Sequence, residues 1–427
     1  MMSGIIEELL SDIPIPKMVK ICQIFERPII DNVGKACVEK LYGTGLIERI
    51  KAGQSVAVAV GSRGIKNIAL IVKTVVAEIK KRGASPFIVP AMGSHGGATA
   101  EGQKAVLWGL GVTEEYVRAP IKSSMEVVKL GKTEDGLPVY FDKIASSADA
   151  IVIINRIKPH TAFRGRVESG LMKMITIGLG KQKGAEACHA MGFGHMAKNI
   201  PQIARFALRK MPIVFGVGII ENAYDETARI EVLSPEEMEE KEAELLIWAK
   251  SHMGKILLNS FDVLIVDEIG KDISGDGMDP NVTGRYPTPY ASGGPEVKRI
   301  VVLSLTERSH GNANGVGTAD FTTRRLFEKM RFDQTYPNAL TSTVVSPVKV
   351  PMVLDTDMLA IQAAIKTLNS VGNDGPTIVR IKNTLKLDEI MISVNLIPFV
   401  KERKDIEILT EPFDLKFDSN GTIEPFA

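Results

Sequence analysis

The residues best suited to chemistry lie between Asn155 and His189, in NRIKPHTAFRGRVESGLMKMITIGLGKQKGAEACH. This segment holds His160, Lys173 and His189, and it begins where a buried, strand-like run ends. A further histidine, His95, lies in the glycine-rich turn GSHGG. Imidazoles exchange protons near neutral pH and bind metals, and a lysine amine can bond covalently to a ligand. The pattern therefore favours a site that moves protons and holds a ligand.

The two histidines His95 and His160 each follow a predicted strand. His95 lies among glycines, with little side-chain cover, and His160 follows Pro159, which restricts the backbone. Each alone could equally be a turn residue bonded to a carbonyl. As a pair they could flank one substrate and exchange a proton from either side, as an enzyme must when it treats both mirror forms alike.

Small residues precede Lys173. Gly165, Ser169 and Gly170 would let the backbone approach a phosphate or a flat ring closely, and two methionines flank the lysine and would partly desolvate its amine. The ordinary alternative is a solvated helix lysine. His189 follows sixteen residues later and could bind a soft metal ion. One histidine does not make a metal site, so the other donors would have to come from a cofactor.

Composition excludes several classes of protein. The 427 residues, 44% of them hydrophobic, suffice for two or three compact domains. The 52 basic residues almost balance the 51 acidic ones, which disfavours nucleic acid or an anionic membrane as a partner. Cys22, Cys37 and Cys188 are widely spaced and form no CxxC, which argues against a disulfide framework or a structural zinc. An acidic N-terminal segment and the lack of a bilayer-length apolar run predict a cytoplasmic protein.

Strand-like and helix-like segments alternate along the chain, which predicts an α/β fold. The apolar run at 54–60, for example, is followed by helical spacing over 65–81. We expect two domains, 1–255 and 256–427, each with a mainly parallel sheet flanked by helices, and an acidic helix at about 234–254 as the bridge. Ligands of such sheets bind at the carboxyl ends of the strands, so we expect the active site in the cleft between the domains.

The second domain adds one long polar loop after its first strand, GKDISGDGMDPNVTGR. Lys271 in this loop is the residue that we expect to contact substrate. The alternative is a plain surface connection, although loops of this length often have a function. Asp272, Asn281 and Arg285 of the same loop could also close over substrate or cofactor phosphate, and His310 could be a cleft residue or a turn histidine, but the sequence does not decide the roles of these four residues.

Together, His95 in GSHGG, His160 in KPH, Lys173 in SGLMK and His189 resemble the nickel-pincer lactate racemase family, over roughly the first 190 residues and more loosely beyond them. The resemblance implies a pyridinium-3,5-bisthiocarboxylic acid mononucleotide, the nickel-pincer nucleotide, tethered to Lys173. It implies that His189 and the cofactor bind the nickel ion and that His95 and His160 are the acid/base pair. It implies that Arg63 binds the substrate carboxylate or a cofactor oxygen.

The activity that this resemblance implies is a racemase or epimerase of a 2-hydroxy acid, which moves a hydride reversibly from the substrate Cα to the cofactor. The partners would be that small molecule and the enzymes that make the cofactor. The chain has SGL where the family has SGG, and its gap from His160 to Lys173 is longer. These departures favour another 2-hydroxy acid, or a sugar acid, over lactate.

Three alternative functions stay open. A 2-hydroxyacid oxidoreductase with a diffusible nicotinamide would be expected to show GxGxxG after its first strand, and here only GSRG follows. A zinc hydrolase would need three protein ligands, and no HExxH motif is present. A non-catalytic carrier of the nickel cofactor would not need two additional histidines.

Overall fold

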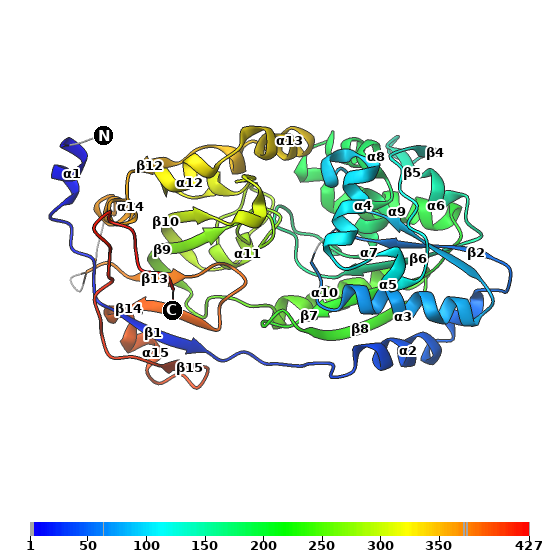
Figure 1. Ribbon diagram of the computed structural model, residues 1–427, viewed down its shortest axis with the longest axis horizontal. Helices are drawn as coiled ribbons and strands as arrows, with labels where there is room; N and C mark the ends of the chain where they lie inside the picture. The colour runs from blue at the N-terminus through cyan, green and yellow to red at the C-terminus, as the bar shows by residue number, and fades with distance from the viewer. Residues whose placement is uncertain (1–3, 63, 370–371, 373–374, 427) are drawn as a thin grey trace. The chain divides into compact units, whose positions relative to one another are not determined.

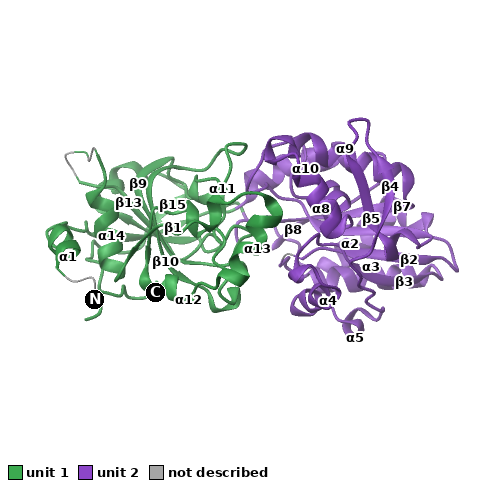
Figure 2. Ribbon diagram, turned by 90° about the horizontal axis from the view of Figure 1, so that it is seen from above, with its two compact units in different colours: residues 1–26, 254–427 green, residues 27–253 purple. Residues whose placement is uncertain are grey.

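The computed structural model describes residues 4–62, 64–369, 372 and 375–426. They divide into two compact units (Figure 2), unit 1 comprising Met1–Glu26 and Gly254–Ala427, and unit 2 comprising Arg27–Met253. The division differs from the predicted 1–255 and 256–427 because the N-terminal segment belongs to the unit formed by the C-terminal half. Its strand β1 (Met18–Gln23) pairs antiparallel with β14 and β15 of that unit.

Unit 2 is built on a five-stranded sheet in the order β3-β2-β6-β7-β8 (Figure 1). Every neighbouring pair is parallel except β7 and β8, which are antiparallel. The small hairpin of β4 and β5 forms a separate sheet. The strand bounds are β2 Ser55–Val60, β3 Ser85–Pro90, β4 Val127–Lys132, β5 Pro138–Asp142, β6 Ala150–Arg156, β7 Ile213–Glu221 and β8 Thr227–Leu233.

Helices cover both faces of this sheet, because successive residues of each strand point to opposite faces and both sets are apolar. In β2, Val56, Val58 and Val60 join the core cluster that contains the buried face of α3, while Ala57 and Ala59 point the other way and are also fully buried. The helix bounds are α2 Val33–Gly43, α3 Ile68–Lys81, α4 Ala100–Gly109, α5 Glu114–Val117, α6 Lys143–Ser146, α7 Leu171–Lys173, α8 Lys181–His189, α9 Met196–Lys210 and α10 Met238–His252.

Helix α10 is the acidic segment that the sequence suggests as a bridge. In the structure it belongs to unit 2 and contacts β7 and α7 there. Its apolar edge explains this packing, since Met238, Leu245, Leu246 and Ala249 recur at helical spacing and are buried. The helix therefore contributes to the core beside the candidate site.

Unit 1 has an eight-stranded sheet in the order β12-β11-β10-β9-β13-β14-β1-β15. Its neighbours are parallel from β12 to β13 and antiparallel from β13 to β15. The strand bounds are β9 Ser260–Ile269, β10 Glu296–Leu305, β11 Phe321–Thr323, β12 Met352–Leu354, β13 Ile378–Ile381, β14 Glu389–Ser393 and β15 Ile406–Ile408. The helix bounds are α1 Ile5–Leu10, α11 Pro280–Thr283, α12 Arg324–Lys329, α13 Phe332–Ser342, α14 Asp357–Lys366 and α15 Ile397–Val400.

The predicted α/β fold with mainly parallel sheets flanked by helices is confirmed. A location of the active site between the two domains stays a prediction. Among the helices that the structure describes, none combines the length and the apolar character needed to cross a membrane.

Candidate functional site

His95 lies in the turn between β3 and α4, directly before the short helix η2 (Gly96–Ala98). The turn requires glycine at position 96, where φ is +66° and a Cβ would come within 2.5 Å of the Gly102 backbone. The Ser62 hydroxyl hydrogen-bonds His95 Nδ1, which orients the ring. Gln103 Nε2 donates to the Gly93 carbonyl at 2.8 Å and to that of His95 at 3.3 Å. Hydrogen bonds therefore hold both the His95 side chain and the backbone of the turn.

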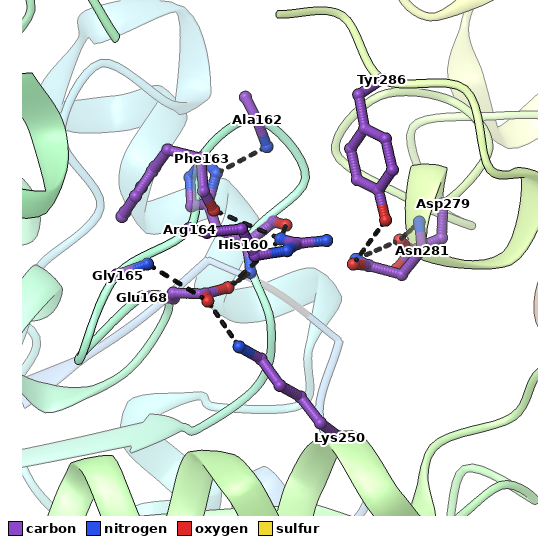
Figure 3. Close-up of polar contacts among 10 residues, drawn as sticks. All are labelled: His160, Ala162, Phe163, Arg164, Gly165, Glu168, Lys250, Asp279, Asn281 and Tyr286. Carbon is purple, nitrogen blue, oxygen red and sulfur yellow. Dashed lines mark hydrogen bonds and ion pairs between the residues drawn. The ribbon is translucent and has the colours of Figure 1, made fainter. Parts of the chain in front are cut away.

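His160 lies in a loop that begins after β6 and closes where Lys158 and Ser169 exchange backbone hydrogen bonds. Its Nδ1 accepts a hydrogen bond from the Ala162 N–H at 3.0 Å (Figure 3). A ring nitrogen that accepts has no proton, so the neutral ring has its proton on Nε2. Burial lowers the pKa of His160 well below its ordinary value, and the positive charge of Lys173 lowers it further. The ring is therefore neutral at pH 7.

Lys173 is the last residue of the short helix α7, and the π-helical turn η3 (Met174–Gly178) follows at once. Such wide turns are rare and occur often at functional sites. The charge of Lys173 lowers the pKa of His160 and that of His189. It also opposes the burial that raises the pKa of Cys188 to about 12. The fold thus brings Lys173 within electrostatic reach of both histidines.

His189 is the last residue of α8, and the hydrogen bond of its Nδ1 shows which ring nitrogen carries the proton. Nδ1 lies 2.7 Å from the Ala185 carbonyl oxygen, which can only accept, so Nδ1 is the donor. A neutral ring in this form has its lone pair on Nε2, the form in which histidine binds metals. Burial lowers the pKa of His189, which also favours the neutral ring. Among the residues with described positions, no three His, Cys, Asp or Glu side chains are grouped so as to hold a metal ion.

The three small residues before Lys173 have local structural contacts. A Cβ on Gly170 would lie 2.3 Å from Glu242 Oε1, and one on Gly165 would lie 3.1 Å from the Val167 carbonyl oxygen. Ser169 pairs with Lys158 through its backbone. Close packing within unit 2 thus accounts for the two glycines, and contact of these three residues with a cofactor stays a prediction.

Two carboxylates near the site are not evident from the sequence. Glu168 has a fully buried side chain that accepts the His160 N–H at 2.7 Å. Glu242 of α10 is also buried and accepts the Met172 N–H at 2.9 Å, at the start of the helix that ends with Lys173. Burial raises the pKa of Glu242 to about 7. In the sequence, Glu242 lies in an acidic run that is typical of an exposed helix face. The signal for its burial is its position three and four residues before Leu245 and Leu246, which places it on the same face of the helix as these apolar residues.

The predicted substrate-binding residues are Arg63 and Lys271. Arg63 lies outside the described residues. Lys271 follows β9 in unit 1, where its Nζ donates to the Gly275 carbonyl oxygen at 2.6 Å. Its neighbour Asp272 accepts from Thr306 Oγ1 at 2.6 Å.

Three further polar residues of unit 1 have partners or conformations that stabilise loops. Asn281 bonds Asp279 and Tyr286 (Figure 3). Arg285 pairs with Asp320. His310 has a φ of +50° at the end of a short helix.

Comparison with known proteins finds a similarity over part of the chain. Residues 29–200 match the family model described as the lactate racemase N-terminal domain. No curated protein matches the chain. Among solved structures it is similar to the lactate racemase apoprotein from Thermoanaerobacterium thermosaccharolyticum, with a TM-score of 0.52 and 15% identity over 87% of this chain and 99% of that chain. At this identity the structural likeness shows the fold alone. The matched segment includes His95, His160, Lys173 and His189, and it confirms the predicted resemblance to lactate racemases.

Proposed function

Because residues 29–200 match the model of the lactate racemase N-terminal domain, we propose that this chain is a racemase or epimerase of a 2-hydroxy acid. The observation that best supports this function is the proximity of His160, Lys173 and His189 in unit 2. The rings of both histidines lie near that of Phe193, at 6.3 and 5.3 Å between centroids, and the charge of Lys173 reaches both. These residues come from the loop after β6, from α7 and from α8, and each has a chemically distinct environment. Their meeting in one place favours a built site over three unrelated surface residues.

The side chains fit a lysine-tethered nickel-pincer nucleotide. His189 would be the protein ligand of nickel, since the Nδ1 bond to Ala185 leaves the lone pair on Nε2. Lys173 would be the tether, at the turn where α7 passes into a π-helix. When bound, this cofactor would accept the hydride from the substrate Cα and return it to either face.

The two remaining histidines would move the hydroxyl proton. In its resting form His160 has its proton on Nε2, because Nδ1 accepts from Ala162, and it would donate a hydrogen bond to the substrate oxygen. His95, bonded to the Ser62 hydroxyl, would be the base that takes the proton. For the opposite enantiomer the roles exchange, and His160 would take the proton at Nε2. This requires the other neutral form of its ring, with the proton on Nδ1 and without the bond from Ala162.

The substrate carboxylate would need a cation. Arg63 is our candidate, because a guanidinium can bind both carboxylate oxygens at once. Lys271 is the second candidate. The carrier alternative requires no proton-moving pair, so turnover separates it from the enzyme.

The first test is chemical modification of Lys173. We expect the intact mass of protein co-produced with the cofactor-making enzymes to exceed the mass of the chain. Lys173→Ala should lack the adduct, whereas Lys183→Ala, an exposed lysine of the neighbouring helix, should keep it. An unmodified wild-type mass under these conditions would contradict the tether.

Turnover is the second test, made on the same loaded protein with a panel of single-enantiomer 2-hydroxy acids. We expect loss of optical purity for at least one of them. A deuterium label at the substrate Cα should be largely retained, because the hydrogen moves as a hydride. Wash-out of the label to water would indicate a carbanion mechanism, and an adduct without any turnover would favour the carrier.

A further inference from the structure

The loop of His160 is held by a carboxylate that the proposed chemistry does not use. Glu168 Oε2 accepts the His160 N–H at 2.7 Å, and Arg164 donates to the His160 carbonyl oxygen at 2.7 Å (Figure 3). Arg164 also lies 3.4 Å from Glu168 Oε2. Both backbone polar groups of His160 are therefore bonded by one ion pair of its own loop.

A second cation reaches the same carboxylate from outside the loop. Lys250 Nζ of helix α10 lies 2.6 Å from Glu168 Oε1, and the Gly165 N–H lies 3.4 Å from that oxygen. The Glu168 side chain is 0% exposed, whereas the Lys250 side chain is 38% exposed. A carboxylate so deeply buried is stable only when it is paired and hydrogen-bonded. The charge of Lys250 therefore stabilises the carboxylate that fixes the His160 backbone.

We propose that Glu168 is a positioning residue that, with Lys250 of α10, fixes the His160 loop and thereby holds the imidazole in the form with its proton on Nε2. The inference rests on the proposed function of His160 as a proton-moving residue. Its physical basis is geometric. The Ala162 N–H that bonds His160 Nδ1 lies two residues beyond the His160 N–H that bonds Glu168, so a loop displaced at residue 160 also loses the bond to the ring.

The substitution Glu168→Gln separates charge from hydrogen bonding. The amide oxygen can still accept the His160 N–H, but Lys250 and Arg164 then face a neutral group and the loop loses its central anion. Lys250→Met removes the cation from α10 alone. The double variant Glu168→Gln with Lys250→Met leaves no unpaired charge between them and is the variant best suited to fold. Lys241→Met is the matched control, because Lys241 lies on the same helix, is exposed and forms an ion pair with its near neighbour Glu244.

The decisive measurement is nitrogen NMR of the histidine rings in the apo protein, which needs no cofactor. The His160 signals are assigned by their loss in His160→Asn. In the wild type we expect one nitrogen of His160 with the shift of a protonated ring nitrogen and the other with that of an accepting one. In Glu168→Gln and in the double variant the two shifts should approach each other, as in a ring that exchanges between both forms, while Lys241→Met keeps the wild-type spectrum.

The result that overturns the inference is a wild-type His160 spectrum in the folded double variant. Tryptophan fluorescence verifies folding, because both tryptophans, Trp108 and Trp248, lie in unit 2. Should Glu168→Gln alone fail to fold, Lys250→Met and the double variant give the answer. A merely structural role would lower stability without changing the form of the ring.

Turnover of the loaded enzyme is a separate arm. We expect kcat of the double variant to fall by about tenfold or more while KM changes by less than about twofold, because a misplaced proton donor affects the transition state more than binding. An inactive wild type would contradict the proposed function and leave the NMR result intact. Unchanged kcat in a variant with an altered His160 spectrum would contradict the catalytic importance of this positioning.

Discussion

At the scale of single residues, the partner of Nδ1 distinguishes His95, His160 and His189, three of the histidines of unit 2. In His189 this nitrogen donates to a carbonyl, in His160 it accepts from an N–H, and in His95 it meets a hydroxyl that can do either. The forms available to the three rings therefore differ, which is consistent with a metal ligand, a resting proton donor and a base. Residue type predicts that these side chains are capable of such roles, and their hydrogen-bond partners restrict which ring nitrogen carries the proton.

Lys181 is a second residue whose importance depends on its surroundings. Its side chain is 0% exposed, and its Nζ lies 3.1 Å from Asp142 Oδ2, which is equally buried, and 2.9 Å from Gln103 Oε1. Gln103 in turn bonds the turn that contains His95. Lys181 is the first residue of α8, and it thus links this helix through Gln103 to the turn that contains His95.

We predict that Lys181→Met lowers the free energy of unfolding by about 3–5 kcal/mol, because it leaves the Asp142 carboxylate buried without its cation. Urea unfolding followed by tryptophan fluorescence measures the change. Lys183→Met, which alters an exposed lysine two residues away, should change it by less than about 0.5 kcal/mol. Equal effects of the two substitutions would show that the buried pair contributes nothing specific.

At the scale of elements, helix α10 packs into the core of unit 2 and also carries two side chains that contact the candidate site. One edge is apolar and buried, and the same edge places Glu242 beside the start of α7 and Lys250 beside Glu168. The Glu242 carboxylate lies where the first N–H groups of α7 lack helical partners, so it satisfies donors that would otherwise be unpaired. Gly170 allows this approach, since any side chain there would occupy the position of the carboxylate.

The raised pKa of Glu242 predicts a pH dependence of stability. Its pKa is 4.5 in an ordinary environment and about 7 in the folded chain, so the folded state keeps this proton while the unfolded state loses it. The free energy of unfolding contributed by this group should therefore fall as pH rises from 4.5 to 7 and be constant above that. Each pKa unit is worth about 1.4 kcal/mol, so the fall amounts to about 3 kcal/mol.

Glu242→Gln isolates this contribution. The difference in unfolding free energy between wild type and variant, followed by tryptophan fluorescence, should decrease by about 3 kcal/mol between pH 4.5 and pH 8. Glu244→Gln, on the exposed side of the same helix, should give a difference that is nearly independent of pH. A constant difference for Glu242→Gln would show that the carboxyl ionises normally in the folded chain.

At the scale of the whole molecule, unit 1 is formed by the first and last segments of the chain, and unit 2 is formed by the segment between them. Unit 2 is a continuous segment, Arg27–Met253, and it contains the family match at residues 29–200. Unit 1 is discontinuous, because β1 lies between β14 and β15 in its sheet. The two units therefore differ in how they depend on the N-terminal residues.

We predict that residues 27–253 fold when they are produced alone, because their strands, helices and core cluster all come from within that range. Circular dichroism and a cooperative urea transition in tryptophan fluorescence test this. Residues 254–427, which contain no tryptophan, should show no cooperative urea transition by circular dichroism when produced alone, and added residues 1–26 should restore it, since β1 bonds both of its neighbours. Cooperative folding of 254–427 without β1 would contradict this dependence.

Periodicity was sufficient to predict the elements whose patterns are local. The alternation at 54–60 corresponds to β2 and the helical spacing that follows to α3, because both patterns arise from burial of one chain segment. The same reasoning does not find β11 (Phe321–Thr323), because three residues are too few to show a period. It also did not place residues 1–26, since strand pairing over more than 360 positions leaves no local pattern.

The sequence by itself determined the chemical inventory, with His95, His160, Lys173 and His189 in turns and short helices of an α/β chain. It did so because residue type, spacing and hydrophobic period are properties of short segments. Only the tertiary structure decided that Lys173 lies within reach of two histidines, that Glu168 and Glu242 are buried beside them, and which ring nitrogen is protonated. These features depend on backbone groups and carboxylates from distant parts of the chain, and their electrostatic effects exist only after folding excludes water.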